Sequence, residues 1–129
     1  RLFYPDKNGL LTPVTTVLAC TDPGQLPLLA LQALIRATVP VNLSRVVPAG
    51  TQVMDISVSD GTASVVLSDQ FMSCDTSAAR AGSAVRSIAA TLCDLSGVTA
   101  VSLSVIGESG LTYYDISEPI TPQPDWFSE

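Results

Sequence analysis

The chain has 129 residues, with 47% hydrophobic and 14% charged side chains and a formal net charge of −6. That length allows one domain with a sufficient core, and the composition is typical of a folded globule rather than a disordered chain. The acidic balance, with only six lysine and arginine residues, argues against binding to nucleic acid or to an anionic membrane surface.

The chain begins with two predicted strands joined by a turn. The first strand is expected at residues 2–4 and a second extended stretch at residues 10–18. Between them, Pro5-Asp6-Lys7-Asn8-Gly9 has the residue types of a turn. Because proline cannot donate a hydrogen bond to a neighbouring strand, Pro13 indicates that the second stretch is an edge strand or carries a bulge.

A first helix is predicted over residues 27–37, opened by one proline and ended before the next. Its body has two clearly polar residues, Gln32 and Arg36. The helix is therefore apolar nearly all round, which is typical of burial on more than one side. One side would face the sheet. The other would either be covered by residues 39–47 or form a partner surface, with Leu29 and Ala33 as the candidate interaction residues.

A β-hairpin is predicted around Asp60-Gly61, because this dipeptide between two alternating runs is typical of a type I′ turn. A two-residue turn fixes the register and sets apolar residues opposite one another: Val58 with Ala63, Ile56 with Val65, and Met54 with Leu67. The other face would then pair serine and threonine: Ser59 with Thr62 and Ser57 with Ser64. One face of the hairpin is expected to be buried.

A second helix is predicted after the hairpin, with Asp75, Thr76 or Ser77 able to cap its start. Its apolar residues recur at helical spacing: Ala78, Ala81, Val85, Ile88, Ala89 and Leu92. Several polar residues fall outside that stripe: Arg80, Ser83, Ser87 and Thr91. The helix is expected to lay its apolar face on the hairpin. A third strand follows, in which Val101, Leu103 and Val105 alternate with serines.

After Gly107 the sequence predicts a turn and an extra strand at residues 111–114. Residues 118–129 contain three prolines and cannot form an interior strand or helix. They are expected to form a Pro-rich tail or linker after a single domain at residues 1–117. Alternatively, Trp126 and Phe127 dock on this domain or on a neighbour. Together the elements predict an α+β fold: one small mixed or antiparallel sheet with two helices packed on one face.

Several short runs carry a family resemblance through their order and spacing. They are Leu2-Phe3-Tyr4-Pro5-Asp6, Leu11-Thr12-Pro13-Val14, Val47-Pro48-Ala49-Gly50-Thr51-Gln52-Val53, residues 60–68, Ala89-Ala90-Thr91-Leu92, residues 97–101 and Val105-Ile106-Gly107. Together they resemble the GerMN domain family of bacterial sporulation and spore-germination proteins and related lipoproteins. The resemblance covers residues 2–107.

The resemblance implies a non-catalytic extracytoplasmic module of a membrane-anchored lipoprotein, which assembles with other envelope proteins or with copies of itself. Its signal peptide or lipidated cysteine would precede Arg1, and only that anchor would reach the membrane. The family also resembles ring-building modules, where the helical side of a small sheet meets a neighbour. The alternative is a domain that binds the cell wall or a small ligand, or an acid-based hydrolase of wall glycans. A deep cleft with convergent carboxylates would favour that hydrolase.

The three cysteines, Cys20, Cys74 and Cys93, allow at most one disulfide within the chain. If the residues between Cys74 and Cys93 are helical, these two are too far apart to pair. Cys20 and Cys74 both lie in loops that lead into a helix, and they are the candidate disulfide. Free buried thiols are the other interpretation.

The chain contains no histidine, which excludes Ser-His and Cys-His nucleophiles and the usual zinc and copper sites. Most acidic residues border predicted turns and helix ends, where capping explains them. No glycine-rich phosphate loop or calcium loop is present in the sequence. We therefore predict a protein that is not an enzyme and that has no catalytic residue, metal or cofactor.

Overall fold

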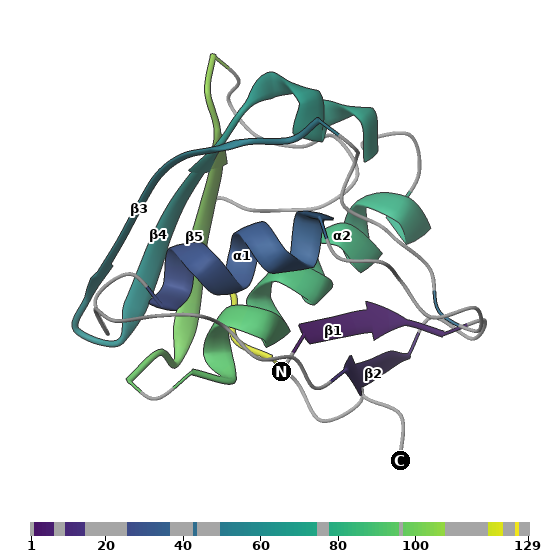
Figure 1. The fold of residues 1–129 in the computed structure, drawn as a ribbon, viewed down its shortest axis with the longest axis horizontal. Coiled ribbons are helices and arrows are strands. Elements are labelled where there is room, and N and C mark those ends of the chain that lie inside the picture. Colours follow the sequence, from purple (N-terminus) through teal and green to yellow (C-terminus); the bar gives the residue numbers. More distant parts are fainter. Residues whose placement is uncertain are drawn as a thin grey trace.

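The computed structural model describes residues 2–6, 10–14, 26–36, 43, 50–74, 78–95, 97–107, 119–122 and 126. Its elements in chain order are β1 (Leu2–Pro5), β2 (Leu11–Val14), α1 (Leu26–Arg36), β3 (Val53–Ser59), β4 (Thr62–Leu67), η2 (Asp69–Cys74), α2 (Ala78–Cys93) and β5 (Ala100–Val105). The strands form a two-stranded sheet, β1-β2, and a three-stranded sheet, β3-β4-β5. Figure 1 shows both helices on one side of the larger sheet. The α+β class and the two helices confirm the prediction, and the strands are divided between two sheets.

The hairpin of β3 and β4 has the predicted Asp60-Gly61 turn, with φ of 54° and 81°. Positive values at both positions are those of a type I′ turn. Most predicted pairs are confirmed: Val58 with Ala63, Ile56 with Val65, Ser57 with Ser64, and Ser59 with Thr62. The predicted pair of Met54 with Leu67 is wrong. A bulge between Val53 and Asp55 shifts the register, so that Leu67 lies opposite Val53.

The apolar face of this hairpin is buried on β4 and only partly covered on β3. The alternating residues Ala63, Val65 and Leu67 of β4 are at most 1% exposed, whereas Met54 and Val58 of β3 are 50% and 43% exposed. The expectation of a fully buried face is therefore wrong for β3. Because β3 is the edge strand of the sheet, its side chains have neighbouring strands on one side only.

The chain crosses from β4 through α2 to β5, which pairs with β4 in parallel. The outer edge of β5 is covered near Val101, whose main-chain N–H donates to the carbonyl of Ile120 at 2.8 Å and whose carbonyl accepts from Ile120 at 2.6 Å. Ile120 and Trp126 are each 7% exposed and belong to the core. A domain boundary after residue 117 stays a prediction, although these two residues beyond it contact the domain. The strand predicted at residues 111–114 lies outside the described residues.

The small sheet is attached to α2 by two hydroxyl side chains. Ser87 Oγ donates to the carbonyl of Phe3, and the main-chain N–H of Phe3 donates to Thr91 Oγ1 at 3.1 Å. Both hydroxyl-bearing residues are 0% exposed. The helical spacing predicts that Ser87 and Thr91 lie outside the buried stripe of α2, and that prediction is wrong because β1 packs on this side of the helix. Pro13 lies opposite Phe3 and is not needed as a donor there.

Helix α1 is tied to the same strand. The hydroxyl of Tyr4, a side chain only 1% exposed, donates to the carbonyl of Leu34 at 3.0 Å. Leu34 is in the last turn of α1, where carbonyls have no partner within the helix. This hydrogen bond fixes the end of α1 that faces the start of β3.

Candidate functional site

The predicted interaction residues of α1 lie on a helix that is largely covered. Leu31 and Leu34 are 0% and 1% exposed, and Leu29 and Ala33 are half-buried. Leu43, from the loop proposed to cover the helix, is partly buried against the core. The other residues of that loop lie outside the described residues, and the role of Leu29 and Ala33 as interaction residues stays a prediction.

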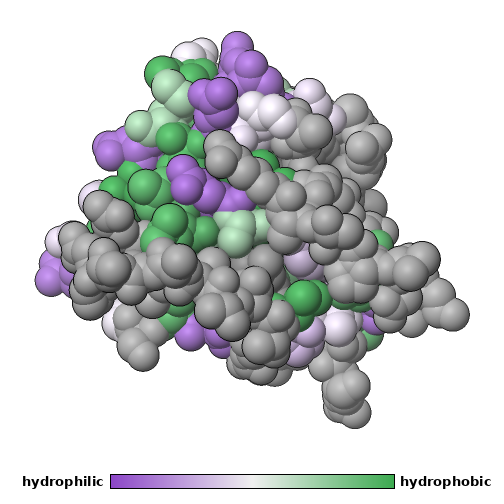
Figure 2. All heavy atoms as spheres, viewed as in Figure 1, coloured by the Kyte–Doolittle hydropathy of each residue, from purple (hydrophilic) through white to green (hydrophobic). Residues whose placement is uncertain are grey.

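Apolar side chains reach the surface beside this helix. Met54 and Val58 on β3 are two of the three large hydrophobic residues that are exposed among the described ones. Figure 2 shows hydrophobic side chains gathered over α1 and β3, with hydrophilic side chains among them. We refer to Leu29, Ala33, Met54 and Val58 as the α1–β3 surface.

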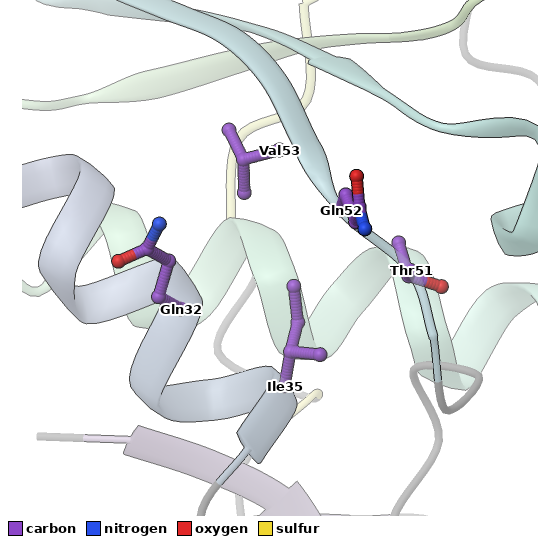
Figure 3. Close-up of a pocket in the computed structure, with 5 residues that line it drawn as sticks. All are labelled: Gln32, Ile35, Thr51, Gln52 and Val53. Atoms are coloured by element: carbon purple, nitrogen blue, oxygen red, sulfur yellow. The ribbon is translucent and has the colours of Figure 1, made fainter.

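A pocket of about 280 Å³ lies between α1 and the start of β3. Five of the described residues line it: Gln32, Ile35, Thr51, Gln52 and Val53. Figure 3 shows the two branched aliphatic side chains, Ile35 and Val53, between Gln32 on the helix and Gln52 on the strand. The pocket thus has carboxamides on opposite sides and methyl groups between them.

The strand wall of the pocket is held by local main-chain geometry. Gly50 has φ of 89°, a value that favours glycine, and it turns the chain into Thr51. Next to it, the main-chain N–H of Gln52 donates to Ser68 Oγ at 2.9 Å, and the N–H of Ser68 donates back to the carbonyl of Gln52 at 2.9 Å. The backbone beneath the pocket is therefore paired on its inner side.

Thr51 is the unusual member of this group. It is 5% exposed, and its Oγ1 is buried with no hydrogen-bond partner among the described residues. A buried hydroxyl without a partner costs about 1–3 kcal/mol. Such groups are rare in native proteins, and this one belongs to a residue that lines the pocket.

The lining does not support acid-base chemistry. None of the five is acidic or basic, so the described part of the lining offers no pair of carboxylates of the kind that a glycan hydrolase uses. Within the described part of the chain, no three histidine, cysteine or acidic residues form a group that could hold a metal ion. The arrangement can bind by hydrogen bonds and apolar contact.

Of the three cysteine side chains, the structure describes only that of Cys93. Cys20 and the side chain of Cys74 lie outside the described residues, and so does the candidate disulfide between them. Cys93, at the end of α2, is a half-buried free thiol. Burial raises its pKa from 9.0 to about 11. The thiol is therefore protonated at neutral pH and is a poor nucleophile.

Trp126 packs on its own domain. Its side chain is 7% exposed, and the Arg86 guanidinium lies 5.5 Å from the ring centroid. Phe127 lies outside the described residues, so its predicted role in docking stays a prediction. Trp126 is not among the residues that line the pocket.

Sequence reasoning did not identify the pocket. From the sequence, Gln32 is only a polar residue of the first predicted helix. Thr51, Gln52 and Val53 are only part of one of the runs that carry the family resemblance. The signal available was that this run, which precedes the first hairpin strand, holds polar residues next to a glycine. Nothing in the sequence placed it beside Gln32.

No helix of the described residues has the length and apolar character needed to cross a membrane.

Known proteins are similar to this chain in sequence and in fold. A family model described as "Germane: Sporulation and spore germination" matches residues 1–110. The first GerMN domain of the sporulation protein GerM from Bacillus subtilis has a similar structure, with a TM-score of 0.69 and 25% sequence identity over 98% of this chain and 94% of that one. Comparison with curated proteins gives no match.

Two further structures are similar. A candidate lipoprotein from Clostridium perfringens has a TM-score of 0.68 over 90% of both chains, and its 18% identity shows a shared fold. The tandem GerMN domains of GerM from Bacillus subtilis give a TM-score of 0.62 and 25% identity over 98% of this chain. The chain covers 44% of that tandem protein.

Proposed function

Because the chain belongs to the Germane family of sporulation and spore-germination domains, we propose that it is a non-catalytic protein-interaction module of an extracytoplasmic, membrane-anchored lipoprotein. It assembles with other envelope proteins or with copies of itself. The resemblance to domains of sporulation proteins and bacterial lipoproteins supports the location. The lack of acidic residues in the pocket supports a role without catalysis.

The α1–β3 surface carries the interaction role. Met54 and Val58 are 50% and 43% exposed on the edge strand, and α1 contacts this strand. An edge strand offers unpaired main-chain groups as well as side chains, and natural proteins usually blunt such edges with charge or proline. The bulge at Met54 and the exposed Asp55 disfavour pairing of another strand with one end of β3. Residues 56–59 keep a regular ladder with β4.

Site-specific photo-crosslinking tests this role. The purified domain would carry a photoreactive amino acid at Met54 or at Leu29 and would be mixed with an envelope fraction of the source bacterium. The matched control is Ser64, an exposed residue on the opposite face of β4 from its buried side chains. Discrete adducts at Met54 and Leu29, at least several times more abundant than at Ser64, are expected. Equal or absent adducts at all three positions would contradict the proposal.

Light scattering of the same domain over a concentration series separates the two kinds of partner. If the crosslinked species is a second copy, the average mass rises with protein concentration, and Val58→Lys abolishes the rise. If the mass stays that of one chain while adducts form, the partner is another envelope protein.

A further inference from the structure

We propose that the pocket between α1 and β3 binds a neutral acetamido group, –NH–CO–CH₃, of a larger ligand. The inference starts from the lining, which combines two carboxamides, one hydroxyl and two branched aliphatic side chains. It does not depend on the protein-interaction role proposed above, because it concerns a small ligand and residues other than the four of the α1–β3 surface.

The ligand must be uncharged. An ion that enters the pocket loses hydration, and none of the five described residues of the lining offers a charge to compensate for that loss. A purely apolar ligand is also disfavoured, because it would displace water from the Gln32 and Gln52 side chains of the lining without replacing the lost hydrogen bonds. A neutral ligand with both a donor and an acceptor satisfies both conditions.

An amide matches the two glutamines. Each glutamine side chain carries one carbonyl oxygen that accepts and one NH₂ group that donates. A secondary amide also has one donor and one acceptor, so its N–H can donate to one glutamine oxygen while its C=O accepts from the NH₂ of the other. Figure 3 shows Gln32 and Gln52 on opposite sides of the pocket, which suits a group that bonds in both directions.

The methyl group of an acetamide matches the aliphatic side chains. Ile35 and Val53 lie between the glutamines in Figure 3, and Ile35 is 6% exposed. A methyl group placed against them would bury apolar area from both partners. The pocket measures about 280 Å³, at or just below the roughly 300–1,000 Å³ of pockets that hold whole small molecules. It fits one substituent of a ligand whose remainder stays outside.

Thr51 supplies the second, independent observation. Its Oγ1 is buried and has no hydrogen-bond partner among the described residues, and in Figure 3 the oxygen lies on the side of Thr51 away from Ile35. Rotation about the Cα–Cβ bond exchanges hydroxyl and methyl between staggered positions. Because Oγ1 makes no hydrogen bond to the described residues in its present position, this rotation gives up none of those bonds, and it would let the hydroxyl donate to the ligand carbonyl.

Amide NMR titration of the 129-residue chain with N-acetylglucosamine tests the proposal. Saturable shifts in the millimolar range are expected at the main-chain amides of residues 32 and 51–53 and at the two glutamine NH₂ groups. Glucose and glucosamine are the controls, since one lacks the nitrogen and the other carries an ammonium group instead of the amide. N-acetylalanine N-methylamide is the second probe, and it separates an acetylated peptide from an amino sugar as the source of the acetamide.

Two variants of pocket residues test whether the ligand binds in this pocket. Two are used so that the result does not depend on the folding of either one. Thr51→Val and Gln32→Leu should each weaken binding about five- to ten-fold, the effect of one lost hydrogen bond. Gln70→Leu, at an exposed glutamine outside the pocket, should leave it unchanged. The proposal is overturned if neither acetamide gives saturable shifts at these residues, if glucose gives the same shifts, or if binding survives both pocket variants.

Discussion

Two regions of this domain bury threonine or serine hydroxyls, and they treat them in opposite ways. Between α2 and β1, Ser87 and Thr91 are 0% exposed and bond to both main-chain groups of Phe3. Beside the pocket, Thr51 is 5% exposed and its hydroxyl has no partner among the described residues. The first pattern is that of a structural joint, where every polar group is used. The second is that of a binding site, where one buried polar group stays without a partner and lowers the stability of the folded state.

The largest expected effect is at the structural joint. Thr91→Val keeps the shape of the side chain but removes the oxygen that accepts from the N–H of Phe3, so the folded state loses this buried hydrogen bond. We expect a loss of about 1–3 kcal/mol in the free energy of unfolding, measured by urea denaturation. Ser64→Ala, at an exposed residue of β4, is the control and should change stability by less than about 0.5 kcal/mol. A neutral Thr91→Val would show that β1 is not held by this bond.

The corresponding change beside the pocket should have the opposite sign. Thr51→Val removes a hydroxyl that has no partner, so the folded state loses a desolvation penalty and keeps its packing. We expect the free energy of unfolding to rise by about 1 kcal/mol, again by urea denaturation. If Thr51→Val destabilises the domain as Thr91→Val does, the hydroxyl is structural and the contrast between the two regions disappears.

Raising the pH should lower the free energy of unfolding by a smaller amount, through the thiol of Cys93 in α2. The pKa of Cys93 is raised from 9.0 to about 11 by burial, so the folded state holds this proton more tightly than the unfolded chain. The resulting stabilisation is complete below about pH 9 and is lost as the pH rises toward 11. Stability measured across this range should fall less steeply in Cys93→Ser than in the parent chain. Identical slopes would contradict the role of this thiol.

The smallest effect is expected on the exposed edge. Val58→Lys changes a side chain that is 43% exposed on β3, so the free energy of unfolding should move by less than about 0.5 kcal/mol. The same variant should reduce crosslinking through Met54. A large loss of stability would show that Val58 belongs to the core and is not part of an interaction surface.

The parts of the fold that could be predicted are those decided by neighbouring residues. Asp60-Gly61 allows one kind of turn, and that turn fixed the pairing of the four residue pairs next to it. The prediction failed at Met54 because a bulge is a choice between two local geometries that alternating residues do not distinguish. It failed at Ser87 and Thr91 because their partner, Phe3, lies 84 and 88 residues away.

The candidate site was even less accessible to sequence reasoning. Leu29 and Ala33 were identified from the apolar character of the first helix alone, which does not separate contact with a partner from contact with the chain's own loop. The pocket needs Gln32 and Thr51 to meet across an intervening stretch without predicted structure. A polar residue in a helical pattern such as Gln32 is expected only to face solvent. Thr51 becomes a candidate only because its buried hydroxyl has no hydrogen-bond partner among the described residues, which the sequence does not show.

The attachment of β1 to α2 also sets an order of events when the chain is made. Synthesis proceeds from the N-terminus, so Phe3 emerges long before Ser87 and Thr91, which must bond to it. Until α2 has formed, β1 and β2 can be no more than a two-stranded ribbon, which is marginally stable alone. Strands β1 and β2 are thus completed by a helix that is synthesised much later in the same domain, and the domain cannot close until α2 has formed.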